Sequence, residues 1–147
     1  MLSGMNQEQT NEYNRNHCKS IAEDLESYYN GDSRRCPECG EIIDRDWDDV
    51  GDKFCCPSCH SITDTEGWEQ LSLWDYFSDC FDIEYRVGSD NELRSVCIMV
   101  ACGGPNIYID TQSKRVELYW WGDRAWYPID YDVCDEIETI FEELRQC

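Results

Sequence analysis

The apolar positions near the start of the chain follow a helical period. Over residues 8–29, apolar and aromatic side chains recur at three- and four-residue spacings, which places them on one helical face. That face consists of Tyr13, His17, Ile21, Leu25 and Tyr28. Thr10 is a possible N-cap, and the turn-forming residues 30–33 end the helix. The pattern predicts one long helix, with His17 packed in its apolar face rather than acting as a ligand.

Residues 83–129 alternate between apolar and polar side chains with a period of two, which is typical of antiparallel strands. The alternation is clearest over 96–101, 107–110 and 116–121, and residues 125–129 provide a possible fourth strand. Glycine, proline and polar turn residues separate these runs. We therefore expect an antiparallel sheet of three or four strands.

Two further helices are expected after residue 70. Ser72 and Asp75 resemble a capping box, and the helix that they open would bury Trp74, Phe77 and Phe81. Residues 131–146 form an amphipathic helix at the end of the chain. Its apolar stripe consists of Val133, Ile137, Ile140, Phe141 and Leu144.

These elements predict an α+β fold in which helices cover the apolar face of the sheet. We expect three parts: an N-terminal helix at 1–33, an inserted cysteine-rich segment at 34–62, and an α+β domain at 63–147. The polar residues 61–70 are expected to be a connector. No internal repeat is apparent.

The cysteine-rich segment contains two C-x-x-C pairs, which read Cys-Pro-Glu-Cys-Gly and Cys-Pro-Ser-Cys-His. Zinc(II) prefers four ligands in a tetrahedron, and two cysteines three positions apart on a tight turn direct both sulfurs inward. The sequence therefore predicts one structural zinc ion. Its four ligands would be Cys36, Cys39, Cys56 and Cys59. Between the pairs, residues 41–43 and 53–54 are expected to form a short hairpin that the metal stabilises.

This segment resembles the zinc ribbon family, in which a β-hairpin joins two such knuckles. The resemblance covers residues 36–60 and implies a metal site that is structural rather than catalytic, because four thiolates close the coordination shell. His60 stands where the second knuckle often has glycine, and either Cys55 or His60 is an alternative to one of the ligands. Iron bound in the manner of rubredoxin is the alternative metal.

The charge of the chain limits its partners. Thirty-two acidic and 12 basic side chains give a net charge of −20. Such a protein repels nucleic-acid phosphates and anionic membranes, whereas it attracts basic proteins. The plain alternative is an acidic surface that only keeps the protein soluble. No apolar run that would indicate a signal peptide or a membrane span is present, so reduced thiols in the cytoplasm of a bacterial host cell are expected.

Two acidic groups are candidate partner-binding residues, and an aromatic group is expected to be packed in the interior, with any exposed part of it forming an interface. The acidic groups are Asp135, Glu136, Glu138, Glu142 and Glu143 on the last helix, and Asp46, Asp48 and Asp49 in the cysteine-rich segment. The aromatic group is Tyr119, Trp120, Trp121, Trp126, Tyr127 and Tyr131. Period-two alternation cannot direct all six rings to one face, so some are expected to lie away from the core.

Three functions are compatible with these features. In charge and size the chain is similar to antirestriction and anti-CRISPR proteins of phages, and residues 100–110 resemble small proteins of bacterial mobile elements. That resemblance implies an inhibitor that binds the nucleic-acid-binding surface of a defence nuclease, in its sharpest form as a DNA mimic. The alternative is a zinc-ribbon interaction module or adaptor without mimicry. An enzyme ranks last, because the sequence nominates no nucleophile, base or open metal site.

Overall fold

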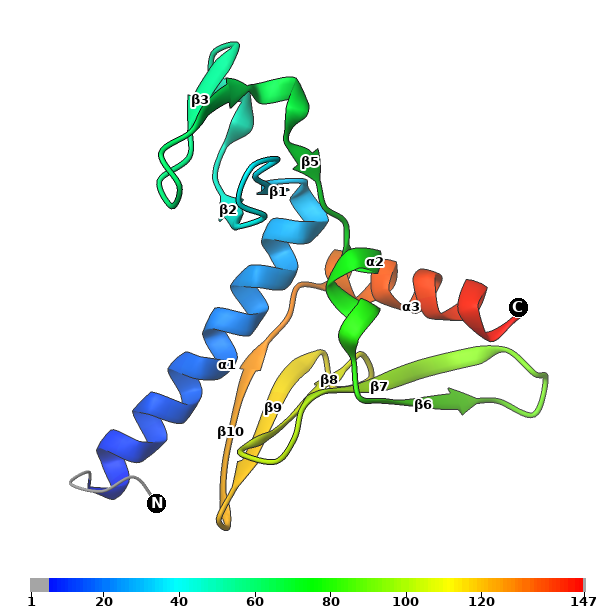
Figure 1. Cartoon of the computed structure of the whole chain (residues 1–147). Helices are drawn as coiled ribbons and strands as arrows, with labels where there is room; N and C mark the ends of the chain where they lie inside the picture. Colours follow the sequence, from blue (N-terminus) through cyan, green and yellow to red (C-terminus); the bar gives the residue numbers. More distant parts are fainter. Residues whose placement is uncertain (1–5, 147) are drawn as a thin grey trace.

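The computed structural model describes residues 6–146, and it confirms a mixed α+β fold (Figure 1). A long helix, α1 (Gln7–Asn30), leads into a small cysteine-rich unit, and the rest of the chain forms a five-stranded sheet with two helices on it. The two parts have separate hydrophobic cores that share no residue. Among the helices of residues 6–146, none is long and apolar enough to cross a membrane.

Helix α1 has the predicted extent, but its start and its buried face differ from the prediction. The N-cap is Asn6, whose side chain accepts a hydrogen bond from the backbone N–H of Gln9 at 2.8 Å. The helix ends at Gly31, which adopts a left-handed φ of 79° as C-cap. The buried residues are Thr10, Asn14, Cys18, Ala22 and Leu25.

The predicted positions of Tyr13 and His17 in the core are therefore wrong, since both side chains are exposed. The buried face is centred one residue later along the chain at this end of the helix. It consists of small side chains, which let the helix lie close to the sheet, whereas the larger rings are left on the flank.

The main sheet has five antiparallel strands in the order β10-β9-β8-β7-β6. The strands are β6 (Asp82–Val87), β7 (Leu93–Ala101), β8 (Asn106–Asp110), β9 (Arg115–Trp120) and β10 (Asp123–Pro128). The expectation of three or four strands was too low, because residues 82–87 add an edge strand that pairs with β7.

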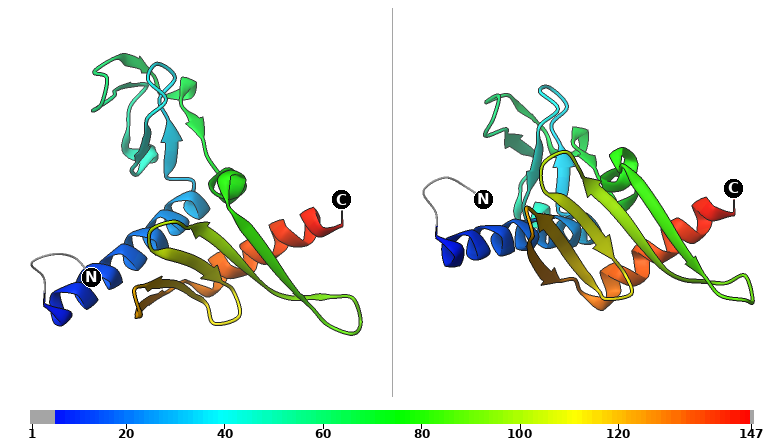
Figure 2. Two further views of the ribbon diagram at one scale, coloured as in Figure 1. Left: turned by 60° about the horizontal axis from the view of Figure 1, so that its bottom comes forward. Right: turned by 90° about the horizontal axis from the view of Figure 1, so that it is seen from below.

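Both long helices cover the same face of this sheet (Figure 2). Helix α1 lies against β9 and β10, and α3 (Tyr131–Arg145) lies against β7. Four of the five residues predicted for the apolar stripe of α3 are buried, and Leu144 is partly exposed. The core between helices and sheet is built from alternate strand residues such as Val96, Ile98, Ile109 and Leu118.

Helix α2 (Leu73–Tyr76) is one turn long and continues into the 3₁₀ turn η3 (Phe77–Asp79). The Asp75 carboxylate accepts a hydrogen bond from the backbone N–H of Ser72 at 2.8 Å, as the capping pattern predicts. Leu73 and Phe77 are buried, whereas Trp74 and Phe81 are 49% and 61% exposed. The prediction that Trp74 and Phe81 are buried is wrong. Leu73 and Phe77 form the buried side of this turn, so Trp74 lies on a neighbouring side, and Phe81 comes after the helix and η3 have ended.

The cysteine-rich unit consists of two hairpins and a returning strand. Strand β1 (Ser33–Arg35) pairs with β2 (Ile42–Asp44), and β3 (Lys53–Cys55) pairs with β4 (Ile62–Asp64). The expected pairing of residues 41–43 with 53–54 is therefore wrong, because each knuckle is the loop of its own hairpin. The supposed connector 61–70 contains β4, the 3₁₀ turn η2 (Thr65–Gly67) and β5 (Glu69–Gln70), which pairs with β1.

The chain enters and leaves this unit through two neighbouring segments. Gly31 and Asp32 lead in from α1, and Leu71 and Ser72 lead out to α2. The side-chain amide of Gln70 donates to the carbonyl of Gly31 at 3.2 Å, and the backbone N–H of Leu71 donates to the carbonyl of Ser33 at 2.9 Å. The two segments are therefore held together at the junction.

A candidate four-cysteine metal centre

The sulfur atoms of all four predicted ligands converge on one point between the two hairpins. They lie within 4.8 Å of one another. Cys36 Sγ is 3.8 Å from Cys59 Sγ, and Cys39 Sγ is 3.7 Å from Cys56 Sγ. Each knuckle contributes one buried and one more exposed sulfur, since Cys36 and Cys56 are buried and the other two reach the surface. Such a cluster is able to hold one metal ion.

The two knuckles have the same internal hydrogen bonds. In each, the backbone N–H two residues after the first cysteine points to that cysteine's sulfur at 3.4 Å, from Glu38 in one and from Ser58 in the other. N–H groups aimed at sulfur favour the thiolate, which is the form that binds metal. The local backbone therefore prepares both knuckles for ligation.

Each knuckle closes with a residue in the left-handed region. Gly40 has φ 78° and donates to the carbonyl of Cys36 at 3.0 Å. His60 has φ 62° and donates to the carbonyl of Cys56 at 2.9 Å. His60 thus performs the backbone role of a knuckle glycine, and its side chain is not part of the sulfur cluster.

The spare thiol of Cys55 is also outside the cluster. Its Sγ lies 3.6 Å from the carbonyl of His60, to which it donates. The arrangement of side chains therefore favours the four cysteines of the C-x-x-C pairs over the alternatives with Cys55 or His60.

The matching knuckles reveal an internal repeat that the sequence analysis missed. The pattern Cys-Pro-x-Cys-x-x-Ile-x-Asp occupies residues 36–44 and again residues 56–64, at an offset of 20 positions. In both copies a strand precedes the knuckle, a strand follows it, and a 3₁₀ turn comes next: η1 (Trp47–Asp49) in the first and η2 in the second. The shared isoleucine and aspartate were a signal in the sequence that could have shown this repeat.

The two more exposed thiols of the cluster, Cys39 and Cys59, differ in pKa. Hydrogen bonds from the side chain and backbone of Ser61 lower the pKa of Cys59 to about 6. At Cys39, a backbone hydrogen bond at Glu41 lowers the pKa, but desolvation and the three neighbouring thiols outweigh it and raise the pKa to about 12. Crowded thiols hold their protons unequally, and a bound cation would displace those protons.

Three aromatic rings support the cluster from one side. The centroids of Trp47, Phe54 and Trp68 lie 5.0 to 5.3 Å apart in pairs. Both indole N–H groups have acceptors, since Trp47 donates to the carbonyl of Asp32 at 2.8 Å and Trp68 donates to Thr63 Oγ1 at 2.9 Å. The buried core of the unit is Trp47 and Trp68 with Cys36 and Cys56, and only four partly buried side chains pack against it, so few apolar contacts hold it.

The predicted acidic residues fall on two separate surfaces. Asp46, Asp48 and Asp49 lie at the 3₁₀ turn η1 of the cysteine-rich unit, where the Asp46 side chain accepts from the backbone N–H of Asp48. The other five lie on α3, which Figure 1 draws below that unit and to the right, beside α2. The two groups therefore do not form one continuous surface.

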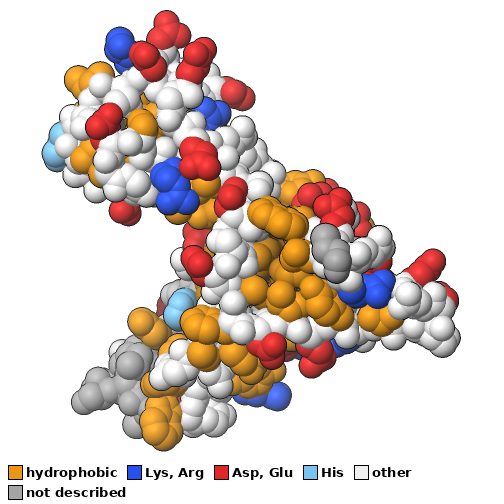
Figure 3. All heavy atoms as spheres, turned by 45° about the vertical axis from the view of Figure 1, so that its right-hand side comes forward, with side chains coloured by type: hydrophobic (Ala, Val, Ile, Leu, Met, Phe, Trp, Pro, Cys, Tyr) orange, Lys and Arg blue, Asp and Glu red, His pale blue; other side chains and the backbone are white. Residues whose placement is uncertain are grey.

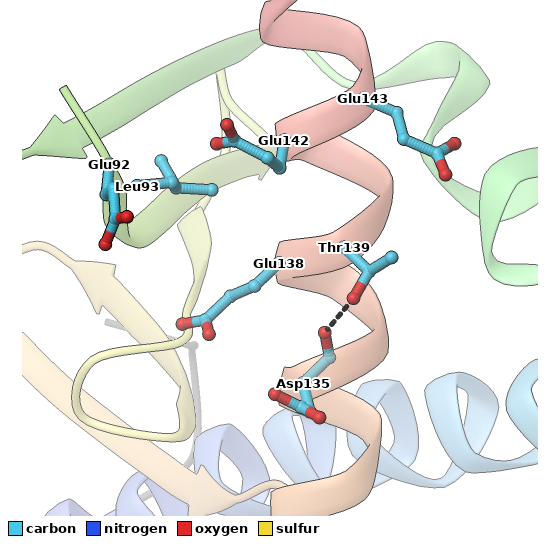
Figure 4. A pocket seen from close by; sticks show the side chains of 7 residues that line it. All are labelled: Glu92, Leu93, Asp135, Glu138, Thr139, Glu142 and Glu143. Atoms are coloured by element: carbon cyan, nitrogen blue, oxygen red, sulfur yellow. Dashed lines mark hydrogen bonds between the residues drawn. The ribbon is translucent and has the colours of Figure 1, made fainter.

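Four of these five carboxylates of α3 line a hollow of about 460 Å³. Figure 4 shows Glu138 and Glu142 pointing from the helix toward Glu92 and Leu93, with Glu143 on the other side of the helix. Glu142 is already paired with Arg145 at 2.8 Å, and this hydrogen bond lowers the pKa of Glu142. Its charge is thus largely compensated within the protein.

Two basic residues reduce the negative charge of the neighbouring part of this surface. Arg94 and Lys114 line a second hollow together with Asp135 and Glu138. The carboxylates at the start of α3 therefore face positive charge on that side, whereas Glu136 lies on the other side of the helix, in a different groove.

The aromatic group is divided between faces, as the alternation predicts. Trp120 and Tyr127 are partly buried against the core, whereas the other four rings are exposed. The exposed rings are Tyr119, Trp121, Trp126 and Tyr131. They do not gather at the sulfur cluster, and they belong to the main sheet and the start of α3.

The arrangement at the knuckles can do one thing chemically, which is to bind a metal ion through four sulfurs. Compared with protein-family models, with curated proteins and with solved structures, the chain shows no significant match to any of them.

Proposed function

We propose that the four-cysteine centre holds one structural zinc ion. A tetrahedron with zinc–sulfur bonds of about 2.3 Å has sulfur–sulfur edges of about 3.8 Å. The sulfur pairs Cys36–Cys59 and Cys39–Cys56, at 3.8 and 3.7 Å, fit that shape and are far too long for a disulfide. Four thiolates leave no position for water or substrate, so the ion stabilises the fold instead of catalysing a reaction.

Metal analysis of the purified protein tests this assignment. We expect one zinc per chain, and Cys36→Ser should lose it, because three sulfurs hold zinc less tightly than four. Cys55→Ser is the matched control and should keep its zinc. Bound iron, which would colour the protein, or full zinc content in Cys36→Ser would contradict the assignment.

We further propose that the protein is a binding module for a basic protein surface. The observation that supports this is the outer side of α3, where all five predicted carboxylates are at least partly exposed on a helix whose other side is buried. The net charge of −20 adds long-range attraction for a positively charged partner. In the sharpest form of the proposal, the partner is a nuclease and the carboxylates occupy its nucleic-acid groove.

Charge-matched variants separate a specific surface from bulk charge. Asp135→Asn, Glu136→Gln and Glu138→Gln together change the net charge from −20 to −17. Glu12→Gln, Glu23→Gln and Glu26→Gln, on the exposed side of α1, make the same change and serve as the control. Immobilised proteins are exposed to a bacterial lysate at low and high salt, and captured proteins are identified by mass spectrometry.

We expect the wild type and the control to capture the same basic proteins and the α3 variant to lose most of them. If the partner uses its nucleic-acid groove, duplex DNA should displace it. Equal loss of captured proteins in both variants would mean that bulk charge, and not the surface of α3, attracts them. Capture of no protein by the wild type would reject the proposal.

An adaptor that uses the cysteine-rich unit is the second candidate. It is favoured by Ile62, which is 69% exposed on β4, and by Ile42, the equivalent residue of the repeat, which is also exposed. Exposed isoleucines beside the four-cysteine centre offer a partner an apolar contact surface. In that case Cys36→Ser would abolish capture, and the α3 variant would retain it.

A further inference from the structure

A groove of about 570 Å³ lies where the end of α1, the start of α2 and one side of α3 meet. Leu73 and Ile140 are its buried apolar lining, at 2% and 8% exposure. Three aromatic side chains complete it: Tyr28, Tyr29 and Trp74. Tyr29 and Trp74 are 42% and 49% exposed, so both rings are accessible to a partner. Figure 3 shows hydrophobic side chains gathered on the face that contains α2.

The groove carries negative charge. Glu136 is its one charged lining residue, and the polar lining residues Asn30 and Ser72 are neutral. Carboxylates that do not line the groove add to its negative charge. The pKa of Tyr28 is raised first by burial and then by the charges of nearby aspartates, whereas the charge of Arg35 lowers it. These aspartates are Asp44, Asp24 and Asp75.

We propose that this groove binds a cationic side chain, arginine or lysine, that projects from a partner protein. Aromatic faces attract cations through their quadrupole, and the attraction strengthens when the site is partly shielded from water. Arginine and lysine also carry long apolar stems, which suit the buried leucine and isoleucine. Glu136 then supplies the opposite charge for the head group.

The negative charge is what selects this occupant. An apolar anchor such as leucine would fill the same space but would leave Glu136 and the surrounding carboxylates without compensation, and an acidic side chain would be repelled. The inference rests on the proposed function, because it assumes a basic partner, and it names where one basic side chain of that partner is held.

The test is an NMR titration of the zinc-loaded full-length protein with three blocked tripeptides. Each has the form acetyl-Gly-X-Gly-amide, with X as arginine, lysine or the neutral straight-chain residue norleucine. We expect the arginine and lysine peptides to shift the backbone amides of residues 28–30 and 72–74 in a saturable way. Norleucine should bind at least about fivefold more weakly, because it lacks the charge.

Variants locate the binding. Trp74→Leu should abolish saturable binding of the arginine peptide, and Glu136→Gln should weaken it about threefold or more. Trp121→Leu and Glu23→Gln remove an exposed tryptophan and an exposed carboxylate elsewhere, and they should bind like the wild type. The remaining amide signals report in every case whether the variant is folded.

Equal affinity for norleucine and arginine would overturn the inference, as would the absence of saturable shifts up to about 20 mM peptide, above the millimolar range of weak contacts. Its failure is distinguishable from that of the proposed function. If the peptides do not bind but the charge-matched capture experiment succeeds, only the groove is rejected. If the peptides bind but capture fails, the basic partner surface is rejected.

Discussion

His60 occupies a backbone conformation that usually belongs to glycine. With φ 62° it matches Gly40 of the first knuckle, and a side chain in this region costs about 1–2 kcal/mol from crowding of its Cβ. Because the knuckle needs the turn to bring Cys56 and Cys59 together, the metal site sustains this strain.

His60→Gly should therefore stabilise the zinc-loaded protein, by roughly 0.5–1 kcal/mol after the extra freedom of glycine in the unfolded chain is deducted. Thermal unfolding measures the change. His60→Ala keeps the Cβ and should be no more stable than the wild type. Both variants should bind one zinc, and loss of metal in both would show instead that the imidazole is a ligand.

Asp24 is a carboxylate whose surroundings oppose its charge. Burial is the main cause, followed by the charges of Asp44 and Glu23, and together they raise its pKa in the folded protein. A raised pKa means that the folded state binds the proton more tightly than the unfolded state. The ionised group therefore destabilises the protein above the folded pKa, and the penalty fades as the pH falls toward the unfolded value of about 3.9.

Asp24→Asn should raise the free energy of unfolding at pH 7, and its advantage over the wild type should disappear near pH 3. Denaturant titrations at several pH values measure it. Glu26→Gln removes the same charge from an exposed position of α1 and should have a smaller effect at pH 7. Equal effects of the two substitutions would mean that overall charge, and not the site of Asp24, is responsible.

At the scale of secondary structure, the cysteine-rich unit would owe most of its stability to the zinc ion that we propose. Its longest strands have three residues, and its core contains two tryptophans and two of the ligand cysteines. Hairpins of this size are not stable alone, whereas zinc contributes about 10 kcal/mol or more to small folds of this kind. The main core has its own residues and does not draw on the metal.

Removal of the metal with a strong chelator should unfold residues 33–70 and leave the five-stranded sheet intact. In NMR spectra, we expect the signals of Trp47 and Trp68 to lose their dispersion while those of β7 to β9 keep their positions. Adding the chelator to Cys36→Ser should change nothing further. Collapse of the whole spectrum would show that the two cores fold as one.

Structure could be predicted from the sequence where a local pattern determines which side chains lie on the same side. Two C-x-x-C pairs identify the four cysteines whose sulfurs converge, and alternation from Val96 to Trp120 identifies three strands, because each pattern fixes which side chains point the same way. Pairing between segments is different. Nothing in residues 41–43 says whether they pair with 53–54 or with 33–35, and the prediction failed at that point.

The helices show a second limit of pattern reasoning. In α1 the rings of Tyr13 and His17 suggested a buried face, but close approach to the sheet required small side chains on the adjacent face. For α2, the pattern could not reveal that the helix ends after one turn. The pattern also placed Trp74 on the same side as Phe77, whereas Leu73 takes that side, so the groove that Trp74 lines was not anticipated.

Over the whole molecule, like charges dominate. Thirty-two acidic groups face 12 basic ones, and four of the ion pairs of residues 6–146 join two exposed side chains, where each contributes little. Repulsion among the remaining carboxylates therefore destabilises the compact state. Salt screens such repulsion, since the Debye length falls from about 10 Å at 0.1 M to about 3 Å at 1 M.

The melting temperature should accordingly rise by a few degrees as sodium chloride increases from about 0.05 to 0.5 M. Calorimetry of the zinc-loaded protein measures the change. The α3 variant with a net charge of −17 should show a smaller rise. A melting temperature that falls with salt would mean that the exposed ion pairs outweigh the repulsion.

The two segments that lead into and out of the cysteine-rich unit have a thermodynamic consequence. Residues 28–30 come just before the unit and residues 72–74 just after it, and these two segments form one side of the groove. Metal that orders the unit also fixes the separation of the two segments. Binding of a ligand that contacts both segments is therefore coupled to binding of the metal. If zinc raises the affinity for the ligand by some factor, the ligand raises the affinity for zinc by the same factor. If both proposals hold, the affinity of the protein for zinc would report whether the groove beside the cysteine-rich unit is occupied.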